Sequence, residues 1–245
     1  ELYERIIVLN GDGTPTENGD AFRTAMGQAS FLAPTATSPV LLWLEPGTYD
    51  VGTTMVSTFD HVHLRGAGQE ATIIIGAVRA ERDVAAVIQL RDGEVSDLTV
   101  VNTSSTTGSG NFSSGIRHNG DLTIRRVTVR VDSTGGASTP TAVDSRAGDL
   151  VVEDSRLTVA GALITRGVWA NTSLASRTTT VRRTTIEATG ELGFGYDVFL
   201  QSATGVIEFS TLNGDNAVLS RDSTIRHSTM LGPVDIDTNG TVTCL

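Results

Sequence analysis

Lysine is absent from the sequence, and cysteine occurs once, at position 244. All 18 basic residues are therefore arginines, so chemistry that depends on a lysine amine, such as Schiff-base formation, is excluded. A single cysteine can form neither an internal disulfide nor a cysteine-based metal site, and we expect Cys244 to be free or to pair with another chain. No metal or cofactor is expected; Ca²⁺ is left open, although no motif indicates it.

Aromatic residues and long apolar runs are also scarce. An aromatic content of 5% fits a core of Val, Ile, Leu, Ala and Thr better than one built on large rings. The longest apolar stretch, PVLLWLEPG, is strand-sized, and no run approaches the ~20 residues that span a bilayer, so membrane insertion is not expected. A formal net charge of −10 disfavours binding to a phosphate backbone, so no nucleic-acid partner is expected.

A strand-like frame recurs along the chain from residue 95 onward. The apolar residues that open successive frames are 29, 28, 29, 26 and 18 residues apart, and they are Val95, Ile124, Val152, Val181, Ile207 and Ile225. A second short strand precedes each frame, with its apolar anchor at Ile88, Ile116, Val143, Val168, Val198 or Val218. Units of about 20 to 30 residues without a helix cannot bury their own apolar face, so they must stack on their neighbours. The sequence therefore predicts an all-β, single-stranded parallel β-solenoid of about seven coils.

Two outward positions follow each frame opening, and their charge alternates from frame to frame. The pairs are Ser96–Asp97, Arg125–Arg126, Glu153–Asp154, Arg182–Arg183, Glu208–Phe209 and Arg226–His227. Equivalent positions of adjacent coils lie about 4.8 Å apart in a parallel stack, so like charges would repel there and opposite charges pair. Each exposed pair contributes about 0.2–1 kcal/mol, and we interpret the series, the charge ladder, as a device that fixes the register of the coils.

The open ends of a solenoid need caps. The stretch ENGDAFRTAMGQASFLA predicts an N-terminal capping helix, with Asp20 as its N-cap and Ala21, Phe22, Ala25, Met26 and Ala29 on one apolar face. The C-terminal VDIDTNGTVTC predicts either a closing hairpin or a last incomplete coil. We divide the chain, as one domain overall, into an N-terminal strand and capping helix at 1–36, a β-helix at 37–235 and a closing segment at 236–245.

Residues 41–76, LLWLEPGTYDVGTTMVSTFDHVHLRGAGQEATIIIG, carry a PGTY turn followed by HLRGAG and TIIIG. In these motifs the chain resembles the opening coils of the pectin-lyase-like right-handed parallel β-helix superfamily, and it is most similar to uncharacterised secreted bacterial β-helix proteins. The resemblance implies a right-handed β-helix that is secreted or held at the cell surface. It implies no single activity, because the fold hosts lyases, hydrolases, esterases, tailspikes and adhesins.

The active-site signatures of pectin methylesterases, polygalacturonases and pectate lyases do not carry over to this chain. The stretch GYDVFLQ around Asp197 is a faint counterpart of one methylesterase motif, and Asp60–His61 lies too early for the pectate lyase pair. His61 and His63 lie two apart on one face of a strand, but no third metal ligand is close in sequence.

One outward column on the second strand of each unit does not follow the charge alternation. It consists of Gln89/Arg91, Arg117/Asn119, Asp144/Arg146, Trp169/Asn171, Phe199/Gln201 and Leu219/Arg221. Exposed aromatic rings beside amides and arginines are typical of sites for sugars, acidic sugars included. We predict ligand contacts from Asn119, Trp169, Asn171, Asp197, Phe199 and Gln201. The alternative is that the loops at 102–115 and 170–180 fold over Trp169 and Phe199 and bury them.

Catalytic candidates in this column are few. Asp144 stands alone at its level, and Asp197, two coils away at about 10 Å, is marginal as the second carboxylate of a glycoside hydrolase. A lyase needs a cation and a base, for which Arg117, Asp144 and Arg146 form the best group; His118 should point inward. Two functions stay open: an extracellular protein that binds, and in one version processes, polysaccharide as a lyase or hydrolase; or a non-catalytic, homo-oligomeric structural or adhesive module.

Overall fold

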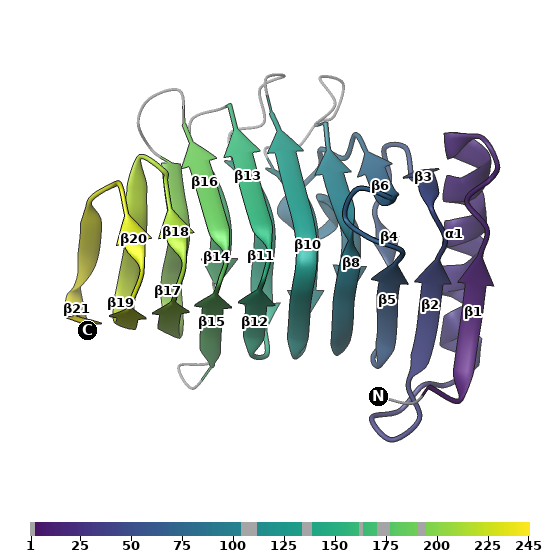
Figure 1. The fold of residues 1–245 in the computed structure, drawn as a ribbon, viewed down its shortest axis with the longest axis horizontal. Coiled ribbons are helices and arrows are strands. Elements are labelled where there is room, and N and C mark those ends of the chain that lie inside the picture. The colour runs from purple at the N-terminus through teal and green to yellow at the C-terminus, as the bar shows by residue number, and fades with distance from the viewer. Residues whose placement is uncertain (1–2, 104–111, 134–138, 162–163, 171–176, 191–194) are drawn as a thin grey trace.

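The computed structural model shows an all-β parallel solenoid with one α-helix near the N-terminus (Figure 1). It describes residues 3–103, 112–133, 139–161, 164–170, 177–190 and 195–245; for 201–203, 217–222, 234–240 and 242 only the backbone is described. No helix among these residues is both long and apolar enough to cross a membrane.

Parallel strands stack in three series, which we call the first, second and third faces. The first face consists of β1 (Arg5–Leu9), β2 (Val40–Leu44), β5 (Val62–Gly66), the first half of β8 (Gly93–Asn102), the first half of β10 (Leu122–Asp132), β12 (Leu150–Glu153), β15 (Thr178–Arg182) and the second parts of β17 (Gly195–Glu208), β19 (Asn216–Arg226) and β21 (Val234–Cys244).

The other two faces complete each turn. The second face consists of β3 (Gly47–Asp50), β6 (Thr72–Gly76), the second halves of β8 and β10, β13 (Arg156–Ala160), β16 (Thr185–Thr189), β18 (Thr211–Leu212) and β20 (Thr229–Met230). The third face consists of β4 (Val56–Ser57), β7 (Ala86–Leu90), β9 (Phe112–Asn119), β11 (Thr139–Ala147), β14 (Thr165–Ala170) and the first parts of β17, β19 and β21.

The predicted anchors form the core. All six frame openings are buried, and so are Ile88, Ile116, Val143, Val168 and Val198 of the second series. Because alternate residues of a strand point to opposite sides, these inward columns leave the residues between them at the surface or at the bends. His118 also points inward as predicted; it is fully buried, with Nδ1 2.7 Å from the carbonyl oxygen of Gly120, and burial lowers its pKa to about 4.

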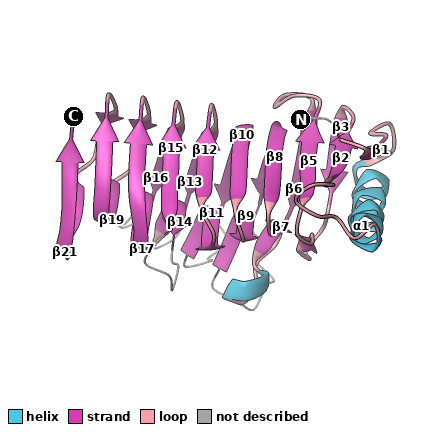
Figure 2. Ribbon diagram, turned by 90° about the horizontal axis from the view of Figure 1, so that it is seen from below, coloured by secondary structure: helices cyan, strands magenta, loops and turns pink. Residues whose placement is uncertain are grey.

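The helix α1 (Pro15–Phe31) covers the N-terminal end of the stack (Figure 2). Phe22, Ala25, Met26 and Ala29 are buried as predicted, whereas Ala21 is exposed. The helix begins earlier than expected, because Thr14 and not Asp20 is the N-cap. Thr14 and Glu17 form a capping box, and Pro15 is the first residue of the helix.

At the other end, β21 runs parallel to β19, so the chain closes with an incomplete coil and not with a hairpin. The first coil is incomplete, because α1 follows β1 directly in the chain. The number of coils therefore differs in detail from the predicted seven.

Successive coils turn from the first to the second face at one backbone position. Asp97, Arg126, Asp154, Arg183, Phe209 and His227 occupy it, and each has a positive φ between 47° and 57°. These six are the second members of the predicted charge pairs, so the charge ladder runs along this bend. Arg126 binds Asp97 through both Nε and Nη2, at 2.6 and 2.8 Å, and Arg183 binds Asp154 in the same way, at 2.6 and 3.0 Å. The alternation of charge is thus confirmed as a stack of ion pairs.

A second ladder, made of hydroxyl groups, lies just inside the bend. The backbone N–H of Val127 donates to Ser155 Oγ, that of Ser155 to Thr184 Oγ1, that of Thr184 to Ser210 Oγ and that of Ser210 to Ser228 Oγ, at 3.1 to 3.4 Å. Each hydroxyl donates back to the carbonyl two residues before it in its own coil. The hydroxyls therefore satisfy backbone groups where the left-handed residue interrupts the regular pairing.

Thr184→Val tests this hydroxyl ladder, since valine keeps the shape of threonine. The change leaves the Ser155 N–H without an acceptor in a buried place, and we expect it to lower the free energy of unfolding by about 1–3 kcal/mol. Urea unfolding measures the loss. Thr158→Val, an outward position on β13, is the matched control; an equal loss in both variants would refute the role of the hydroxyls.

Candidate functional site

The predicted column does stack on the third face, but only in its first members. Gln89, Arg117, Asp144, Trp169, Phe199 and Leu219 are register partners on successive strands. The second members lose register, because a bulge between Ser145 and Ala147 pairs the exposed Asn119 with Ala147 instead of Arg146. Asn171 and the side chain of Gln201 lie outside the described residues.

Trp169 is buried, so the expectation of an exposed ring on this face is wrong. Its side chain is 6% exposed, and the guanidinium carbons of Arg82 and Arg166 lie 3.6 and 4.1 Å from the ring centroid. Phe112 stacks on it at 6.4 Å, and the half-buried Phe199 meets it edge-on at 6.5 Å. The alternative of covered aromatics therefore holds for Trp169 and not for the half-buried Phe199. Phe112, from the first proposed loop, and Arg82, from the short 3-10 helix η1 (Arg82–Val84), contact the Trp169 ring. Residues 104–111 and 171–176 of the two loops lie outside the described residues.

Three arginines lie over this ring, and a fourth, Arg117, shares Asp83 with one of them, Arg146. We call the four the arginine cluster: Arg82, Arg117, Arg146 and Arg166. Asp144, 2% exposed, lies among them, with Oδ2 3.1 Å from Arg146 Nε and Oδ1 4.0 Å from Arg82 Nη2. Burial raises the pKa of Asp144, against the opposing effect of Arg146, Arg82 and Arg117. Burial also lowers the pKa of Arg82 and of Arg166 to about 10. The predicted catalytic trio thus comes together, with Arg117 and Asp144 buried.

Asp197 is not a surface residue of this face. Its carboxylate is buried and accepts two backbone hydrogen bonds, from Ala188 N–H at 2.9 Å and from Gly214 N–H at 2.7 Å. Burial raises the pKa of Asp197 to about 8, and Glu187 and Asp215 add to the shift. The prediction that it approaches a ligand from the edge is wrong; it ties together the turns of two adjacent coils.

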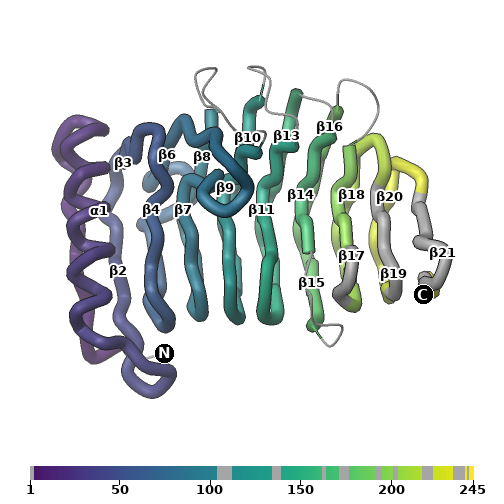
Figure 3. Tube along the Cα trace, turned by 180° about the vertical axis from the view of Figure 1, so that it is seen from behind, coloured from purple at the N-terminus to yellow at the C-terminus, as the bar shows by residue number. Residues whose placement is uncertain are grey.

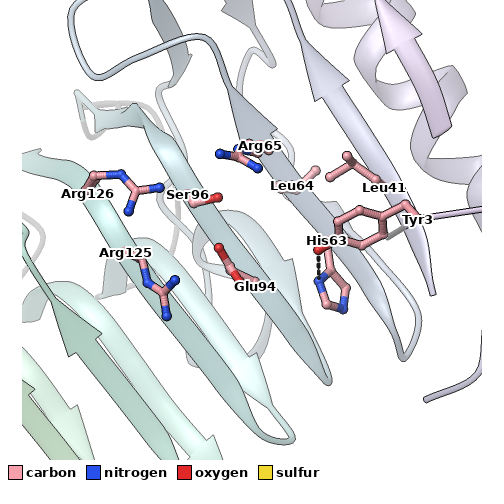
Figure 4. A pocket seen from close by; sticks show the side chains of 9 residues that line it. All are labelled: Tyr3, Leu41, His63, Leu64, Arg65, Glu94, Ser96, Arg125 and Arg126. Carbon is pink, nitrogen blue, oxygen red and sulfur yellow. Dashed lines mark hydrogen bonds between the residues drawn. The ribbon is translucent and has the colours of Figure 1, made fainter. Parts of the chain in front are cut away.

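The first face holds an open pocket that the sequence analysis did not find (Figure 4). Its volume is about 220 Å³, and its lining comes from the segment before β1 and from β2, β5, β8 and β10. The lining residues are Tyr3, Leu41, His63, Leu64, Arg65, Glu94, Ser96, Arg125 and Arg126. On one side the phenol oxygen of Tyr3 lies 2.8 Å from Nδ1 of His63, and on the other side the three arginines carry their guanidinium groups.

The arginines of this first-face pocket share too few carboxylates. Asp97 binds both Arg65 and Arg126, and Glu153 binds Arg125 together with Arg182 and Arg183. From β5 to β15 the ladder positions thus hold five arginines, Arg65, Arg125, Arg126, Arg182 and Arg183, against three carboxylates, Asp97, Glu153 and Asp154. The ladder positions of this stretch are therefore locally positive in a chain whose net charge is −10.

The pocket opens into a longer groove. An adjoining hollow of about 480 Å³ shares His63 and Glu94 with it and continues toward β12. Its lining residues include the carboxylates Asp92, Glu94, Asp121 and Asp149 and no arginine. No group of three His, Cys, Asp or Glu side chains in the described part of the chain could hold a metal ion, so the His61–His63 pair lacks further ligands there.

Part of this site is visible in the sequence, but only the register of the strands shows that its residues come together. His63 and Arg65 lie two residues apart on outward positions of β5, and the register places Arg65 beside Ser96 and Ser96 beside Arg125. Tyr3 is 60 residues from His63, and only the position of the N-terminal segment beside β5 brings the two together.

With this geometry established, the protein can be classed as a right-handed parallel β-helix protein. No protein-family model matches the sequence, and no curated protein matches it. Among solved structures, pectin methylesterase PemA from Erwinia chrysanthemi matches with a TM-score of 0.52 and 9% identity, over 99% of this chain and 93% of that one. The A-module of mannuronan C-5 epimerase AlgE6 from Azotobacter vinelandii matches with a TM-score of 0.48 and 14% identity, over 96% and 89% of the two chains. At 9% identity the match to PemA shows the fold alone.

Proposed function

We propose that this protein binds an acidic polysaccharide along its first face and cleaves it by β-elimination. The observation that carries the proposal is the open pocket in which Arg65, Arg125 and Arg126 face the hydrogen-bonded pair of Tyr3 and His63. A polysaccharide outside cells is the natural ligand for such a surface, so we further propose that the protein is secreted or held at the cell surface.

The charge of the first-face pocket favours an anionic sugar unit, because Arg65, Arg125 and Arg126 line it. The adjoining hollow extends this surface to β12, but carboxylates line it, so the pocket is the part that binds a sugar carboxylate. Guanidinium groups bind carboxylates through paired, charge-assisted hydrogen bonds, and the arginine excess on this stretch leaves capacity for such bonds. The support comes from these residues; the two named neighbours act on polysaccharides according to their names, but at 9% and 14% identity they support the fold alone.

The same residues supply the groups that β-elimination from a uronate needs. An arginine neutralises the sugar carboxylate, which makes the adjacent C5 proton more acidic. His63 takes that proton, the electron pair forms the C4=C5 double bond, and the C4–O glycosidic bond breaks. The leaving oxygen takes a proton from the Tyr3 hydroxyl. A glycoside hydrolase would need two carboxylates beside the scissile bond, whereas Glu94 is the single carboxylate among the residues that line the pocket; Asp92, Asp121 and Asp149 line the adjoining hollow.

His63→Gln tests the reaction. We expect the variant to bind polymannuronate or polygalacturonate as the wild type does and to form unsaturated ends about 10²- to 10⁴-fold more slowly, because the proton acceptor is lost. Ultraviolet absorbance of the unsaturated ends measures the rate. His227→Asn, which alters an exposed histidine far along the ladder, is the control. Binding without any unsaturated product in the wild type would refute the elimination and leave the binding intact.

A second candidate is a non-catalytic structural or adhesive module that forms homo-oligomers. It is favoured by the exposed thiol of Cys244 on β21, which can pair with a cysteine of another chain. Size-exclusion chromatography with light scattering distinguishes the two, because the module requires an oligomer and no product from any polysaccharide.

A further inference from the structure

The arginine cluster of the third face carries more positive than negative charge. Among the described residues, two carboxylates accompany its four guanidinium groups: Asp144, buried between them, and Asp83, on η1. The internal segments outside the described residues contain one acidic residue, Glu191. Buried charge without a partner is unfavourable, so such a cluster is stable when an anion completes it.

Arg166 is the member of the cluster whose buried donors most clearly lack an acceptor among the described residues. Its side chain is 9% exposed, and its guanidinium carbon lies 4.1 and 4.9 Å from the ring centroids of Trp169 and Phe199. The Nε and Nη1 atoms are buried and have no hydrogen-bond partner among the described residues. The rings hold the guanidinium group in place, while these charged donors remain available to an acceptor.

Asp83 occupies the outer side of the cluster. Its Oδ1 accepts from Arg117 Nη2 at 2.8 Å and from Arg146 Nη2 at 3.1 Å, yet its side chain is 82% exposed. Arg117 also holds η1 through the carbonyl oxygen of Arg82, at 2.6 Å. Figure 3 shows the segment between β6 and β7, to which η1 belongs, in front of β9. Because the Asp83 side chain is exposed while Arg117 is buried, a free anion can take the place of this carboxylate at the two guanidinium groups.

We propose that the arginine cluster is a second binding site, for a small oxyanion, and that Asp83 takes the place of this anion when the site is empty. The ligand has at least two acceptor oxygens, as in phosphate, sulfate or the carboxylate of a sugar acid. It binds Arg117 and Arg146 on the outer side and Arg166 further in. The site lies on a different face from the polysaccharide groove, so it does not depend on the proposed function.

Isothermal titration with phosphate, sulfate and galacturonate, each against chloride at equal ionic strength, tests the proposal and separates the sources. We expect saturable binding of at least one of the three by the wild type. Asp83→Asn removes the competing carboxylate and should bind that anion about fivefold more tightly. Arg166→Gln removes the inner donors and should bind it at least about tenfold more weakly.

Asp20→Asn, which removes an exposed carboxylate from α1, is the control for the change in net charge and should bind as the wild type does. If Arg166→Gln fails to fold, the ratio of affinities between Asp83→Asn and the wild type decides, since Asp83 is at the surface. No binding in either the wild type or Asp83→Asn, or equal tightening by Asp83→Asn and Asp20→Asn, would overturn the proposal.

Discussion

Glu153→Arg is expected to lower the free energy of unfolding by about 3–5 kcal/mol, which corresponds to a fall in Tm of about 10 °C for a chain of this size. Glu153 is 6% exposed and binds Arg125, Arg182 and Arg183 from the two adjacent coils. The substitution removes all three ion pairs and brings four guanidinium groups together. Thermal and urea unfolding measure the loss.

Two further variants show whether the charge ladder is the cause. Arg125→Glu in the Glu153→Arg background restores one opposite pair, because residues 125 and 153 are register partners, and should recover about 1 kcal/mol or more. Glu70→Arg makes the same change of charge at an exposed loop position and should have little effect. Equal destabilisation by Glu70→Arg and Glu153→Arg would show that net charge matters and stacking does not.

Asp197→Asn is expected to abolish the largest pH dependence of stability above pH 4. Because the pKa of Asp197 is raised to about 8 in the folded protein, from an ordinary value of 3.8, the folded state binds this proton more tightly than the unfolded state. Stability of the wild type, relative to the variant, should therefore fall by about 1.4 kcal/mol per pH unit as the pH rises from about 4 to 8. Urea unfolding at a series of pH values gives this slope, and a fixed penalty from the amide does not change it.

Asp97→Asn provides the contrast. Hydrogen bonds from Arg126 lower the pKa of Asp97, so its contribution to stability is present above the ordinary pKa and is lost as the pH falls below it. The two variants should thus show pH dependences of opposite sign, in different pH ranges. A wild-type curve parallel to that of Asp197→Asn between pH 4 and 8 would mean that the Asp197 carboxyl does not hold its proton as described.

The fold was predictable because its determinants repeat. Val95, Ile124 and Val152 recur at nearly constant spacing, and Arg126 and Asp154 must alternate in charge if their coils stack. What the repeat could not reveal is the backbone at the bend: the positive φ of these charged residues, and the acceptor role of Ser155, follow from the three-dimensional turn.

The candidate site was harder to predict because it depends on segments outside the repeat. Trp169 occupies an outward position by alternation, but Arg82, 87 residues earlier in the numbering, covers it, and no periodicity indicates that η1 folds over this face. Asn119 and Arg146 were expected to be register partners on adjacent coils, but a single bulge pairs Asn119 with Ala147. Tyr3 meets His63 only because the N-terminal segment lies beside β5.

The central claim is that the arginine-lined pocket of the first face binds an acidic polysaccharide. The most direct test measures the affinity of polymannuronate and polygalacturonate for the wild type, for Arg125→Gln in the pocket and for Arg156→Gln, an exposed arginine of the second face, with neutral dextran as the reference polymer. We predict that the wild type binds at least one polyuronate and not dextran, that Arg125→Gln weakens this binding by about tenfold, and that Arg156→Gln leaves it unchanged. Unchanged binding in Arg125→Gln, or an equal loss in both variants, would contradict the claim.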